Sequence, residues 1–294
     1  MSTLPPTVWG NHRLEWGQHT HVMGIINVTP DSFSGDGIIR ETMTTENVVA
    51  QAVALAQQFV AEGATMIDVG GESTRPRTSV NSLAIEQERA RVLPVISALY
   101  KALPENVMIS VDTYHAEVAR QALDAGACII NDIWGLQRDA TMAKLASERG
   151  VPVILMANMR GFQKREIVSD VLRFLARSIE LALAAGVAWE RIIVDPGIGF
   201  GTTPDENLIL LRRLGELRAL GRPILLGTSR KSTIGLVLGG LPASERVEGT
   251  AATVALGIAQ GVDIVRVHDV HEMVRVVKMS DAIVRGTYTL PSST

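Results

Sequence analysis

The stretch Val22-Met-Gly-Ile-Ile-Asn-Val-Thr-Pro-Asp-Ser-Phe33 begins as an apolar run and ends in polar residues. Continuous apolar runs are typical of parallel strands that are covered on both faces, because neither side meets water. Short runs of this kind recur along the whole chain. They span residues 22–28, 65–70, 107–112, 127–133, 151–156, 191–195, 223–227 and 263–267. The sequence therefore predicts eight buried strands.

Longer stretches with helical spacing separate these strands. In residues 46–62 the apolar side chains of Val49, Ala52, Val53 and Ala56 repeat at the spacing of one buried helix face. The other expected helices span 86–103, 116–125, 140–149, 167–185, 205–220, 244–260 and 270–284. Eight strand–helix units in order predict an α/β fold, a single-domain (β/α)8 TIM barrel. The alternative is an open doubly wound sheet, but its Gly-x-Gly-x-x-Gly fingerprint is absent from the sequence.

Length and composition limit the kind of protein. The barrel is expected at residues 22–286, after a short N-terminal hairpin within residues 1–21 and before a tail at 287–294. A net charge of -3 and an aromatic content of 4% argue against nucleic acid or membrane partners. A signal-peptide pattern and an apolar stretch of about 20 residues are both absent, so we expect a cytoplasmic protein. The one cysteine, Cys128, is expected to be a buried strand residue.

Polar side chains follow every one of the eight apolar runs. In a barrel the carboxyl ends of the strands form one rim, and that rim holds the active site. A lone aspartate at a strand end is explained equally well as a helix cap, but capping alone does not explain eight such sites. The rim residues are Asn27, Thr74, Arg75, Asp112, Asn131, Asn158, Asp195, Lys231, Arg266 and His268.

The chemistry of these rim residues has two halves. Asp112, Asn131 and Asp195 suit a flat heterocycle with adjacent N–H donors, because a carboxylate accepts two parallel hydrogen bonds. A second set consists of donors suited to phosphate oxygens. Its members are Thr74, Arg75, Lys231, Arg266 and His268. Asn27 offers a neutral oxygen that Mg²⁺ accepts beside phosphate and water. The rim therefore predicts a ligand that is part heterocycle and part phosphate.

Two further polar residues have simpler interpretations. Glu72 is a possible catalytic group, but an ion pair with a rim arginine is the favoured interpretation. His115 opens an expected helix and is interpreted as a surface or capping residue.

At this point the motifs resemble the dihydropteroate synthase family of pterin-binding enzymes. The segment from Met23 through Phe33, and the segment Ile67-Asp-Val-Gly-Gly-Glu-Ser-Thr-Arg-Pro76, are similar to the two signatures of that family. The remaining matching segments follow in order and bring the resemblance to about residues 22–284. They are Ser110-Val-Asp-Thr113, Ile130-Asn-Asp132, Asp195-Pro-Gly-Ile-Gly-Phe-Gly201, Gly227-Thr-Ser-Arg-Lys-Ser232 and Arg266-Val-His-Asp269.

The resemblance implies a reaction and a role for each matching residue. The family joins a dihydropterin pyrophosphate to 4-aminobenzoate, and a homodimer is expected. The implied pterin contacts are Asp112, Asn131, Met156, Asp195, Gly227 and Lys231, and Asn27 is the implied ligand of Mg²⁺. The implied pyrophosphate contacts are Thr74, Arg75, Arg266 and His268. The aminobenzoate is expected between Phe33, Pro76, Phe200 and Ser232. The catalytic residues expected on this basis are Asp112, Lys231, Arg266 and His268.

The sequence departs from the family in two places. The family usually has Met-His-Met after the fifth strand, whereas this chain has Met156-Ala-Asn-Met159. Gly35-Asp-Gly37 stands where the family commonly has Asp-Gly-Gly. Two alternatives remain open: a methyltransferase-type pterin barrel, which does not need the pyrophosphate donors, and a non-catalytic pterin-binding paralogue.

Overall fold

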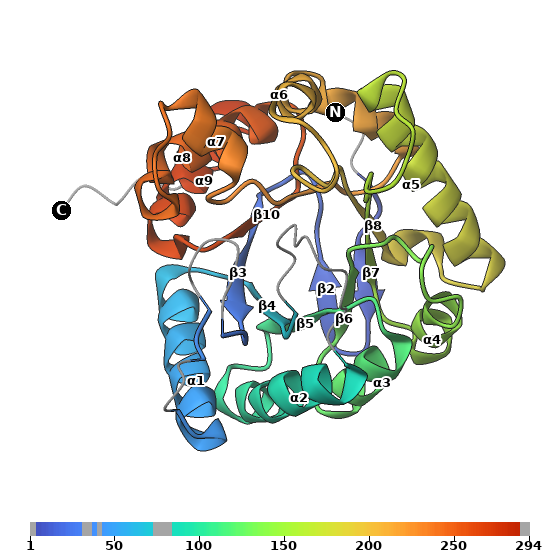
Figure 1. The fold of residues 1–294 in the computed structure, drawn as a ribbon, viewed down its shortest axis with the longest axis vertical. Coiled ribbons are helices and arrows are strands. Elements are labelled where there is room, and N and C mark those ends of the chain that lie inside the picture. The colour runs from blue at the N-terminus through green and yellow to red at the C-terminus, as the bar shows by residue number, and fades with distance from the viewer. Residues whose placement is uncertain (1–3, 31–36, 40–42, 73–83, 289–294) are drawn as a thin grey trace.

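The computed structural model describes residues 4–30, 37–39, 43–72 and 84–288. Within these residues it contains a barrel of eight parallel strands surrounded by helices, as Figure 1 shows from the end of the barrel. The strands are β3 (His21–Asn27), β4 (Met66–Gly70), β5 (Met108–Asp112), β6 (Ile129–Asp132), β7 (Val153–Met156), β8 (Ile192–Asp195), β9 (Leu225–Leu226) and β10 (Ile264–Val267). All eight predicted strands are present, so the predicted barrel is confirmed.

The strands are hydrogen-bonded in the order β8-β7-β6-β5-β4-β3-β10-β9. A parallel bridge between Val194 and Ile224 then joins β8 to the chain just before β9, and this bridge closes the barrel. Closure places the carboxyl ends of all eight strands at one rim.

The helices that cover the strands are α1 (Thr45–Glu62), α2 (Ile85–Ala102), α3 (Ala116–Asp124), α4 (Met142–Arg149), α5 (Ile167–Ala184), α6 (Pro204–Arg212), α7 (Ser232–Val237), α8 (Val247–Ala259) and α9 (Val270–Val284). Two expectations about them were wrong. The expected helix at 205–220 is broken at Arg213 and continues as the 3-10 helix η2 (Leu214–Leu220). The short helix α7 was not expected.

The side chain of Gln260 stabilises the break between α6 and η2. Its amide oxygen accepts from the backbone N–H of Gly215, and its amide nitrogen donates to the carbonyl of Leu211. These are two backbone groups that a continuous helix would have paired internally. A glycine also lowers helix propensity by about 1 kcal/mol relative to alanine, so the break combines a weak local sequence with a tertiary contact.

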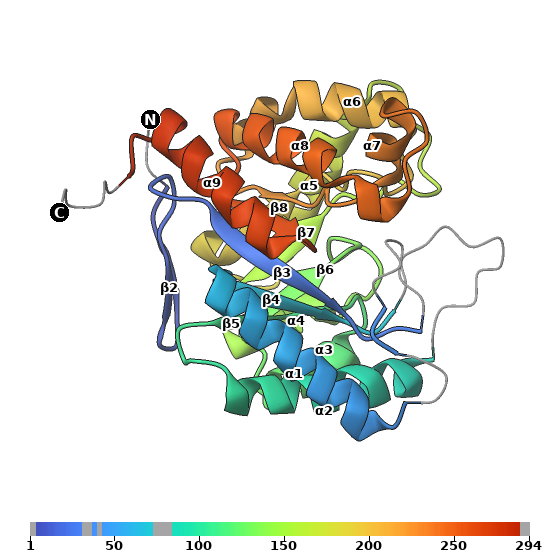
Figure 2. The same cartoon turned by 90° about the vertical axis from the view of Figure 1, so that its left-hand side faces the viewer.

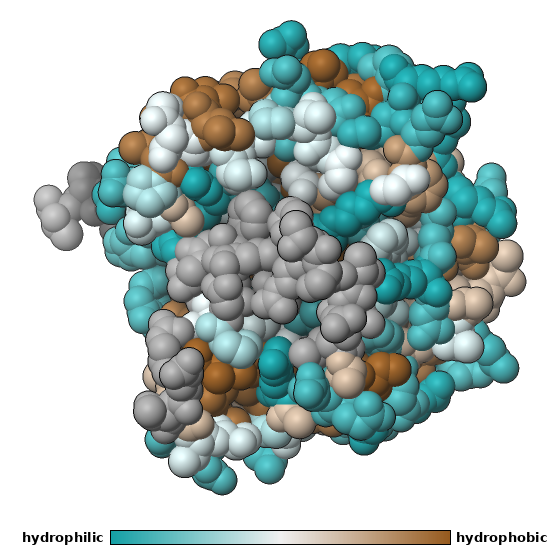
Figure 3. Space-filling view, in the orientation of Figure 1, coloured by the Kyte–Doolittle hydropathy of each residue, from teal (hydrophilic) through white to brown (hydrophobic). Residues whose placement is uncertain are grey.

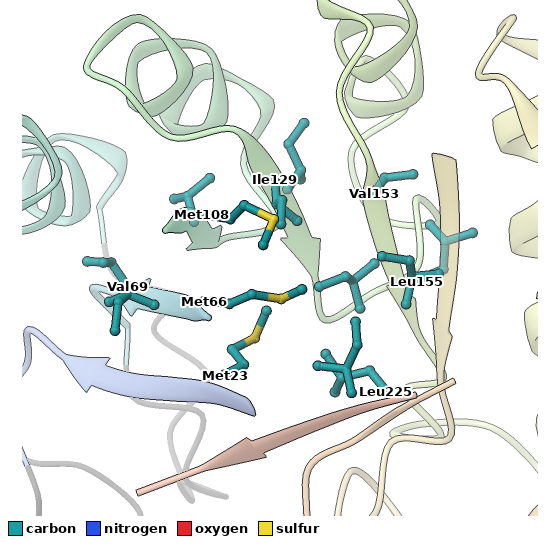
Figure 4. Packing of buried hydrophobic residues seen from close by; sticks show 14 of the residues in the cluster. Met23, Met66, Val69, Met108, Ile129, Val153, Leu155 and Leu225 are labelled. Carbon is teal, nitrogen blue, oxygen red and sulfur yellow. The ribbon is translucent and has the colours of Figure 1, made fainter. Parts of the chain in front are cut away.

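Three neighbouring strands share one pattern that fixes what lies inside the barrel. Their sequences pair in register as Met23 with Met66 and Met108, then Ile25 with Asp68 and Ser110, then Asn27 with Gly70 and Asp112. Paired residues of parallel strands project from the same face. Figure 4 shows the three methionines pointing toward one another, and all three are nearly or fully buried. The barrel interior is therefore apolar near its base and polar at the rim.

A small hairpin covers the opposite end of the barrel. It consists of β1 (Thr7–Trp9) and β2 (His12–Leu14), which are antiparallel, and it lies at the left in Figure 2. Leu14 and Trp16 are fully buried beneath it. The Trp16 indole donates to the Thr7 hydroxyl over 3.1 Å, so the hairpin is bonded to the chain that leads into β3.

Among the helices of the described residues, none is both long enough and apolar enough to cross a membrane. Cys128 lies directly before β6 and is partly buried, and burial raises the pKa of its thiol to about 11.

Packing of α1 against β3 gives the first prediction. A Cβ atom at Gly24 would lie 2.5 Å from Cδ2 of the buried Phe59 ring, so Gly24→Ala overpacks the core. We expect a loss of about 1 to 3 kcal/mol in the free energy of unfolding, measured by urea denaturation. Gly215→Ala is the matched control, because the nearest atom to its added Cβ is 3.6 Å away. Equal stabilities of the two variants would contradict this account of the packing.

Candidate active site at the carboxyl rim

A cavity opens at the carboxyl ends of the strands. It is lined by Ile25, Asn27, Glu72, Asp112, Asn131, Ile133, Met156, Asp195, Gly197, Ile198, Phe200, Gly227, Ser229, Lys231, Arg266 and His268. Ten of the predicted site residues lie in this lining: Asn27, Asp112, Asn131, Met156, Asp195, Phe200, Gly227, Lys231, Arg266 and His268. These residues come from all of the strand ends except that of β4, which contributes the adjoining Glu72. The structure thus brings segments more than 200 residues apart into one site.

Strand register places the polar residues of the first wall side by side. Asn27 pairs with Gly70, Gly70 with Asp112, and Asp112 with Asn131. A Cβ at Gly70 would lie 3.4 Å from that of Asp112 and would narrow the space beside the carboxylate. Glycine at this position therefore leaves Asp112 accessible to a ligand.

The guanidinium of Arg266 joins two carboxylates. Its Nε donates to Oδ2 of Asp68 over 2.6 Å, and its Nη2 donates to Oδ2 of Asp112 over 2.8 Å. The side-chain amide of Asn131 also donates to Oδ2 of Asp68, over 3.1 Å. Asp68 is fully buried, so it supports the site from below and does not line the cavity.

Asp68 is a site residue that the sequence interpretation missed. It lies inside the apolar strand β4, between Ile67 and Val69, and not at the strand end. The available signal was a lone acid in an otherwise apolar strand, because charged residues are almost never fully buried unless they are paired.

The carboxyl group of Asp112 has an unusual environment. Burial raises its pKa to about 7, and the nearby Asp68 carboxylate adds to this effect, while Arg266 opposes it. The group therefore titrates close to neutral pH. A carboxyl that changes charge there is a frequent property of functional sites.

Asp195 bonds the turn that follows its strand and also lines the cavity. Its Oδ1 accepts from the backbone N–H of Gly197 over 2.7 Å, so it fixes the turn that follows β8. The residue also lines the cavity, where its Oδ2 lies near Gly227. Burial raises the pKa of this carboxyl to about 6, against the opposing charge of Lys231.

Lys231 lies just before α7 and places its ammonium group against an aromatic ring. Its Nζ is 4.3 Å from the centre of the Phe200 ring. Burial lowers the pKa of Lys231 to about 8, and the charge of Arg266 acts in the same direction. The guanidinium of Arg160 also approaches Phe200, at 5.0 Å from the ring centre. Arg160 is a second residue that the sequence interpretation missed.

His268 is held by the end of β9. Its Nδ1 lies 2.9 Å from Oγ of Ser229, which also accepts from the His268 backbone N–H over 3.1 Å. Burial, followed by the positive charges of Arg266, Arg230 and Lys231, lowers the pKa of His268 well below its usual value. The imidazole is therefore neutral at physiological pH. Arg230 itself is paired with Asp269 over 3.0 Å and does not line the cavity.

The departure after the fifth strand leaves the cavity intact. Met156 lines it, while Asn158 is fully buried behind it. The Asn158 amide donates to the carbonyl of Ile133 over 3.1 Å, and its oxygen accepts from the backbone N–H of Arg160. Asn158 thus braces the segments after β6 and β7 against each other.

Five predicted site residues remain, and only one of them is among the described residues. Ser232 is exposed at the first position of α7 and is absent from the lining. Four others fall outside the described residues: Phe33, Thr74, Arg75 and Pro76.

The expected interpretation of His115 needs correction, and that of Glu72, an ion pair with a rim arginine, stays a prediction. Glu72 lies in the lining, and its carboxylate hydrogen-bonds Tyr114 and so helps burial to raise the pKa of the phenol. The His115 ring is paired with Glu88 over 2.8 Å and makes no side-chain cap for α3. Glu72, Glu88 and His115 lie within 4.8 Å of one another, but the ion pair between His115 and Glu88 accounts for that cluster.

The fold and the site define a barrel enzyme that places carboxylates and an amide beside an ammonium, a guanidinium and a neutral imidazole. Comparison with known proteins gives a consistent result. The profile of the family "Pterin binding enzyme" matches residues 23–268. Dihydropteroate synthase of Clostridium beijerinckii is 46% identical over 277 residues, which are 94% of this chain and 98% of that protein.

Two solved structures are also similar. Dihydropteroate synthase from Clostridium difficile, crystallised in the presence of pteroic acid, is 46% identical with a TM-score of 0.84, over 92% of this chain and 99% of that one. The enzyme from Xanthomonas albilineans with 4-aminobenzoic acid is 37% identical with a TM-score of 0.85, over 96% and 98%. The chain belongs to the dihydropteroate synthase family of pterin-binding enzymes.

The pairing of Arg266 with Asp68 generates a prediction about stability. Asp68→Asn removes the buried negative charge and leaves the guanidinium with a weaker partner. We expect the free energy of unfolding to fall by about 2 to 3 kcal/mol. This is a small loss for a broken buried pair, because the Arg266 side chain is one-fifth exposed. Glu117→Gln, in an exposed pair with Arg120, is the control and should change stability by less than about 0.5 kcal/mol. Chemical denaturation of both variants measures the difference. Similar small losses would show that Arg266 does not depend on Asp68.

Proposed function

We propose that the chain uses the rim cavity to join 6-hydroxymethyl-7,8-dihydropterin pyrophosphate to 4-aminobenzoate, with release of 7,8-dihydropteroate and pyrophosphate. One observation carries this proposal: Asp112, Asn131 and Asp195 line the same cavity as Lys231 and Arg266. A ligand with N–H donors on a ring and an anionic end can bind the carboxylates and the amide with its ring and the two cations with its anionic end. The 4-aminobenzoic acid bound to one relative is a substrate of this reaction type, and the pteroic acid present with the other is the oxidised form of its product.

Asp195 and Asp112 hold the pterin in this proposal. Oδ1 of Asp195 is already engaged by Gly197, so Oδ2 is the oxygen available to the 2-amino and ring N–H groups. Asn131 can bond a further ring heteroatom, and Met156 supplies an apolar wall. Gly227 lets the ring approach the backbone of β9, because it has no side chain at that point.

Arg266, His268 and Lys231 hold the pyrophosphate end. The Ser229 hydroxyl accepts from the backbone N–H of His268 and can donate its own hydrogen to Nδ1. The ring hydrogen of the neutral imidazole then resides on Nε2, where it can meet a phosphate oxygen. Thr74 and Arg75, outside the described residues, complete the proposed set.

Mg²⁺ is proposed at Asn27. The amide of Asn27 lines the cavity, and neutral and phosphate oxygens are the ligands that Mg²⁺ prefers, so the residues present fit the ion. A bound Mg²⁺ supplies a charge that stabilises the diphosphate oxygens. The remaining ligands would come from the diphosphate and from water.

The reaction is a substitution at the exocyclic methylene carbon. The lone pair of the arylamine nitrogen forms the new C–N bond, the C–O bond breaks, and its electron pair leaves with pyrophosphate. The nitrogen releases one proton. Arg266 and Lys231 stabilise the departing charge, while Asp112 stabilises positive charge that develops on the pterin. We place the aminobenzoate against Phe200, with Phe33, Pro76 and Ser232 as its further contacts.

A homodimer in the cytoplasm is proposed for the assembled enzyme. Exposed apolar side chains gather on α7 and α8, where Leu236 is 61% exposed and Leu256 is 64% exposed. Figure 3 shows apolar atoms over these helices, at the upper left of the view. Contiguous apolar surface of this kind suits contact with a second copy of the chain. Light scattering measures the mass directly.

An assay of pyrophosphate release tests the proposed activity. The purified chain is mixed with the dihydropterin pyrophosphate, 4-aminobenzoate and Mg²⁺. Release of pyrophosphate that depends on 4-aminobenzoate supports the proposal. Methyl transfer from methyltetrahydrofolate without pyrophosphate release would favour the methyltransferase alternative, and neither reaction would favour a binding protein.

The first functional prediction concerns Asp195. Asp195→Asn keeps an oxygen for the N–H of Gly197 but turns an NH2 group toward the ligand donors. The lost charge-assisted bond and the unpaired donor should weaken pterin binding by about a hundredfold or more, with little change in melting temperature. Calorimetry and thermal unfolding measure the two quantities. Asp195→Ala is the control, because it also removes the cap and should lower the melting temperature. A lower melting temperature of Asp195→Asn with unchanged pterin affinity would mean that Asp195 only stabilises the turn after β8.

The second functional prediction concerns pH. The pKa of Asp112 is raised to about 7, so this carboxyl loses its charge as the pH falls below that value. The pKa of Lys231 is lowered to about 8, so the ammonium is lost as the pH rises above that value. We expect kcat/KM to have a bell shape with limbs near these values. Lys231→Arg should remove the alkaline limb, because guanidinium stays protonated. An alkaline limb that is the same in both enzymes would exclude Lys231 as its origin.

A further inference from the structure

A second cavity lies at the opposite end of the barrel, on the side of both termini in Figure 2. Its lining includes Arg218 and Gly221 at the end of η2, Arg222 and Ile224 before β9, and Asp263 before β10. Leu4, Trp16, Gly17, Gly261 and Arg285 complete it. None of these residues belongs to the rim cavity. We call this second cavity the floor cavity.

Arg222 is the unusual residue of the floor cavity. Its side chain is only 2% exposed, yet among the residues that the structure describes none accepts a hydrogen bond from Nε or from either Nη. The guanidinium carbon lies 4.5 Å from the centre of the Trp189 ring, so its face is covered. A guanidinium stacked in this way keeps its N–H groups at the edge, and those groups are the ones that lack acceptors.

None of the carboxylates in the described part of the chain is hydrogen-bonded to Arg222. Glu190 is exposed and acts on the Arg222 charge only through space. Burial lowers the pKa of Arg222 to about 10, which still leaves it charged at neutral pH. Oδ2 of Asp263 accepts from the backbone N–H of Ile224 over 3.0 Å, so that carboxylate is already engaged. Burying a charge without an acceptor is costly, and such groups are normally paired.

Arg285 shows what a structural arginine does in the same cavity. It donates to Asp281 over 2.8 Å, to the Thr20 hydroxyl over 3.2 Å and to the carbonyl of Val262 over 2.6 Å. This arginine is therefore satisfied by an acid, a hydroxyl and the carbonyl of the loop between α8 and β10. Arg222 makes no comparable bond to any described residue.

We propose that the floor cavity binds a phosphate-like oxyanion on the edge of the Arg222 guanidinium. The lining carries three arginines and one aspartate, and even with Asp281, the partner of Arg285, counted as well, one net positive charge remains to attract an anion. Arg218 lies exposed at the mouth and supplies a second guanidinium to an entering anion. Guanidinium groups bind phosphate and carboxylate through two parallel hydrogen bonds, which is the pattern that the free edge of Arg222 offers.

The test compares thermal unfolding with and without inorganic phosphate. Arg222→Met keeps the volume of the side chain and removes its charge. Without phosphate this variant should melt at a higher temperature than the parent chain, because an uncompensated buried charge has been removed. With phosphate the parent chain should gain more stability than the variant, because only the parent chain binds phosphate in the floor cavity. Phosphate bound at the rim affects both chains equally and cancels in the comparison.

Arg285→Met is the matched control. Its guanidinium is satisfied by the protein, so this variant should melt earlier whether or not phosphate is present. Calorimetry of phosphate binding should give one site fewer in Arg222→Met, or an affinity weakened more than about tenfold. The condensation activity of Arg222→Met should equal that of the parent chain, because the residue lies at the far end of the barrel. That readout separates this inference from the proposed function.

Two results would overturn the inference. If Arg222→Met melts earlier without phosphate or fails to fold, the guanidinium serves the protein and not a ligand. If phosphate stabilises the parent chain and the variant equally, the floor cavity does not bind it. Phenyl phosphate is measured beside inorganic phosphate in the same assay. If inorganic phosphate and phenyl phosphate bind with equal affinity, the ligand of the floor cavity is the free ion. If phenyl phosphate binds more tightly, the ligand is a phosphoryl group on a larger molecule.

Discussion

The rim depends on one ion-paired group, the guanidinium of Arg266 between Asp68 and Asp112. These three residues come from β10, β4 and β5, so they meet only when β3 pairs with β4 on one side and with β10 on the other. By register Arg266 starts level with Met23, in the apolar base, and its length carries the charge up to Asp112. Two carboxylates so close together would repel each other without it. The pairing of the first barrel strand with the last, β3 with β10, and the charge balance in the site therefore depend on each other.

This constraint sets the electrostatics of the cavity. Because Arg266 is shared, it only partly offsets the burial that raises the pKa of Asp112. Its positive charge also adds to the burial that lowers the pKa of Lys231. The pKa values of Asp112 and Lys231 are thus shifted toward each other, so both groups titrate near neutral pH. A bound diphosphate raises the pKa of Lys231 and keeps it a cation. Positive charge that develops on the pterin stabilises the Asp112 carboxylate, so each half of the ligand favours the charge that the proposed chemistry needs.

The sequence predicted the fold well because each strand and helix of the barrel has a local residue pattern: eight apolar runs, each followed by a stretch with helical spacing. It predicted the rim because strand ends in a barrel converge. It missed Asp68, since an acid inside a strand is explained only by the Arg266 side chain that reaches it from 198 residues away. It missed the break in residues 205–220 for the same reason, because Gln260 comes from another helix. Local residue patterns predict the secondary structure. The partners of long polar side chains depend on the tertiary structure, so local patterns do not predict them.

The buried guanidinium groups at the two ends of the barrel differ in their hydrogen bonding. Arg266 at the rim donates to two carboxylates, so its charge is compensated by the fold before any ligand binds. Arg222 at the floor has no acceptor among the described residues, although it is the more deeply buried of the two. A chain gains no stability from a desolvated charge that nothing compensates. Such a charge is kept for the fold or for a ligand, and because no described residue accepts from Arg222, we attribute it to an anion in the floor cavity.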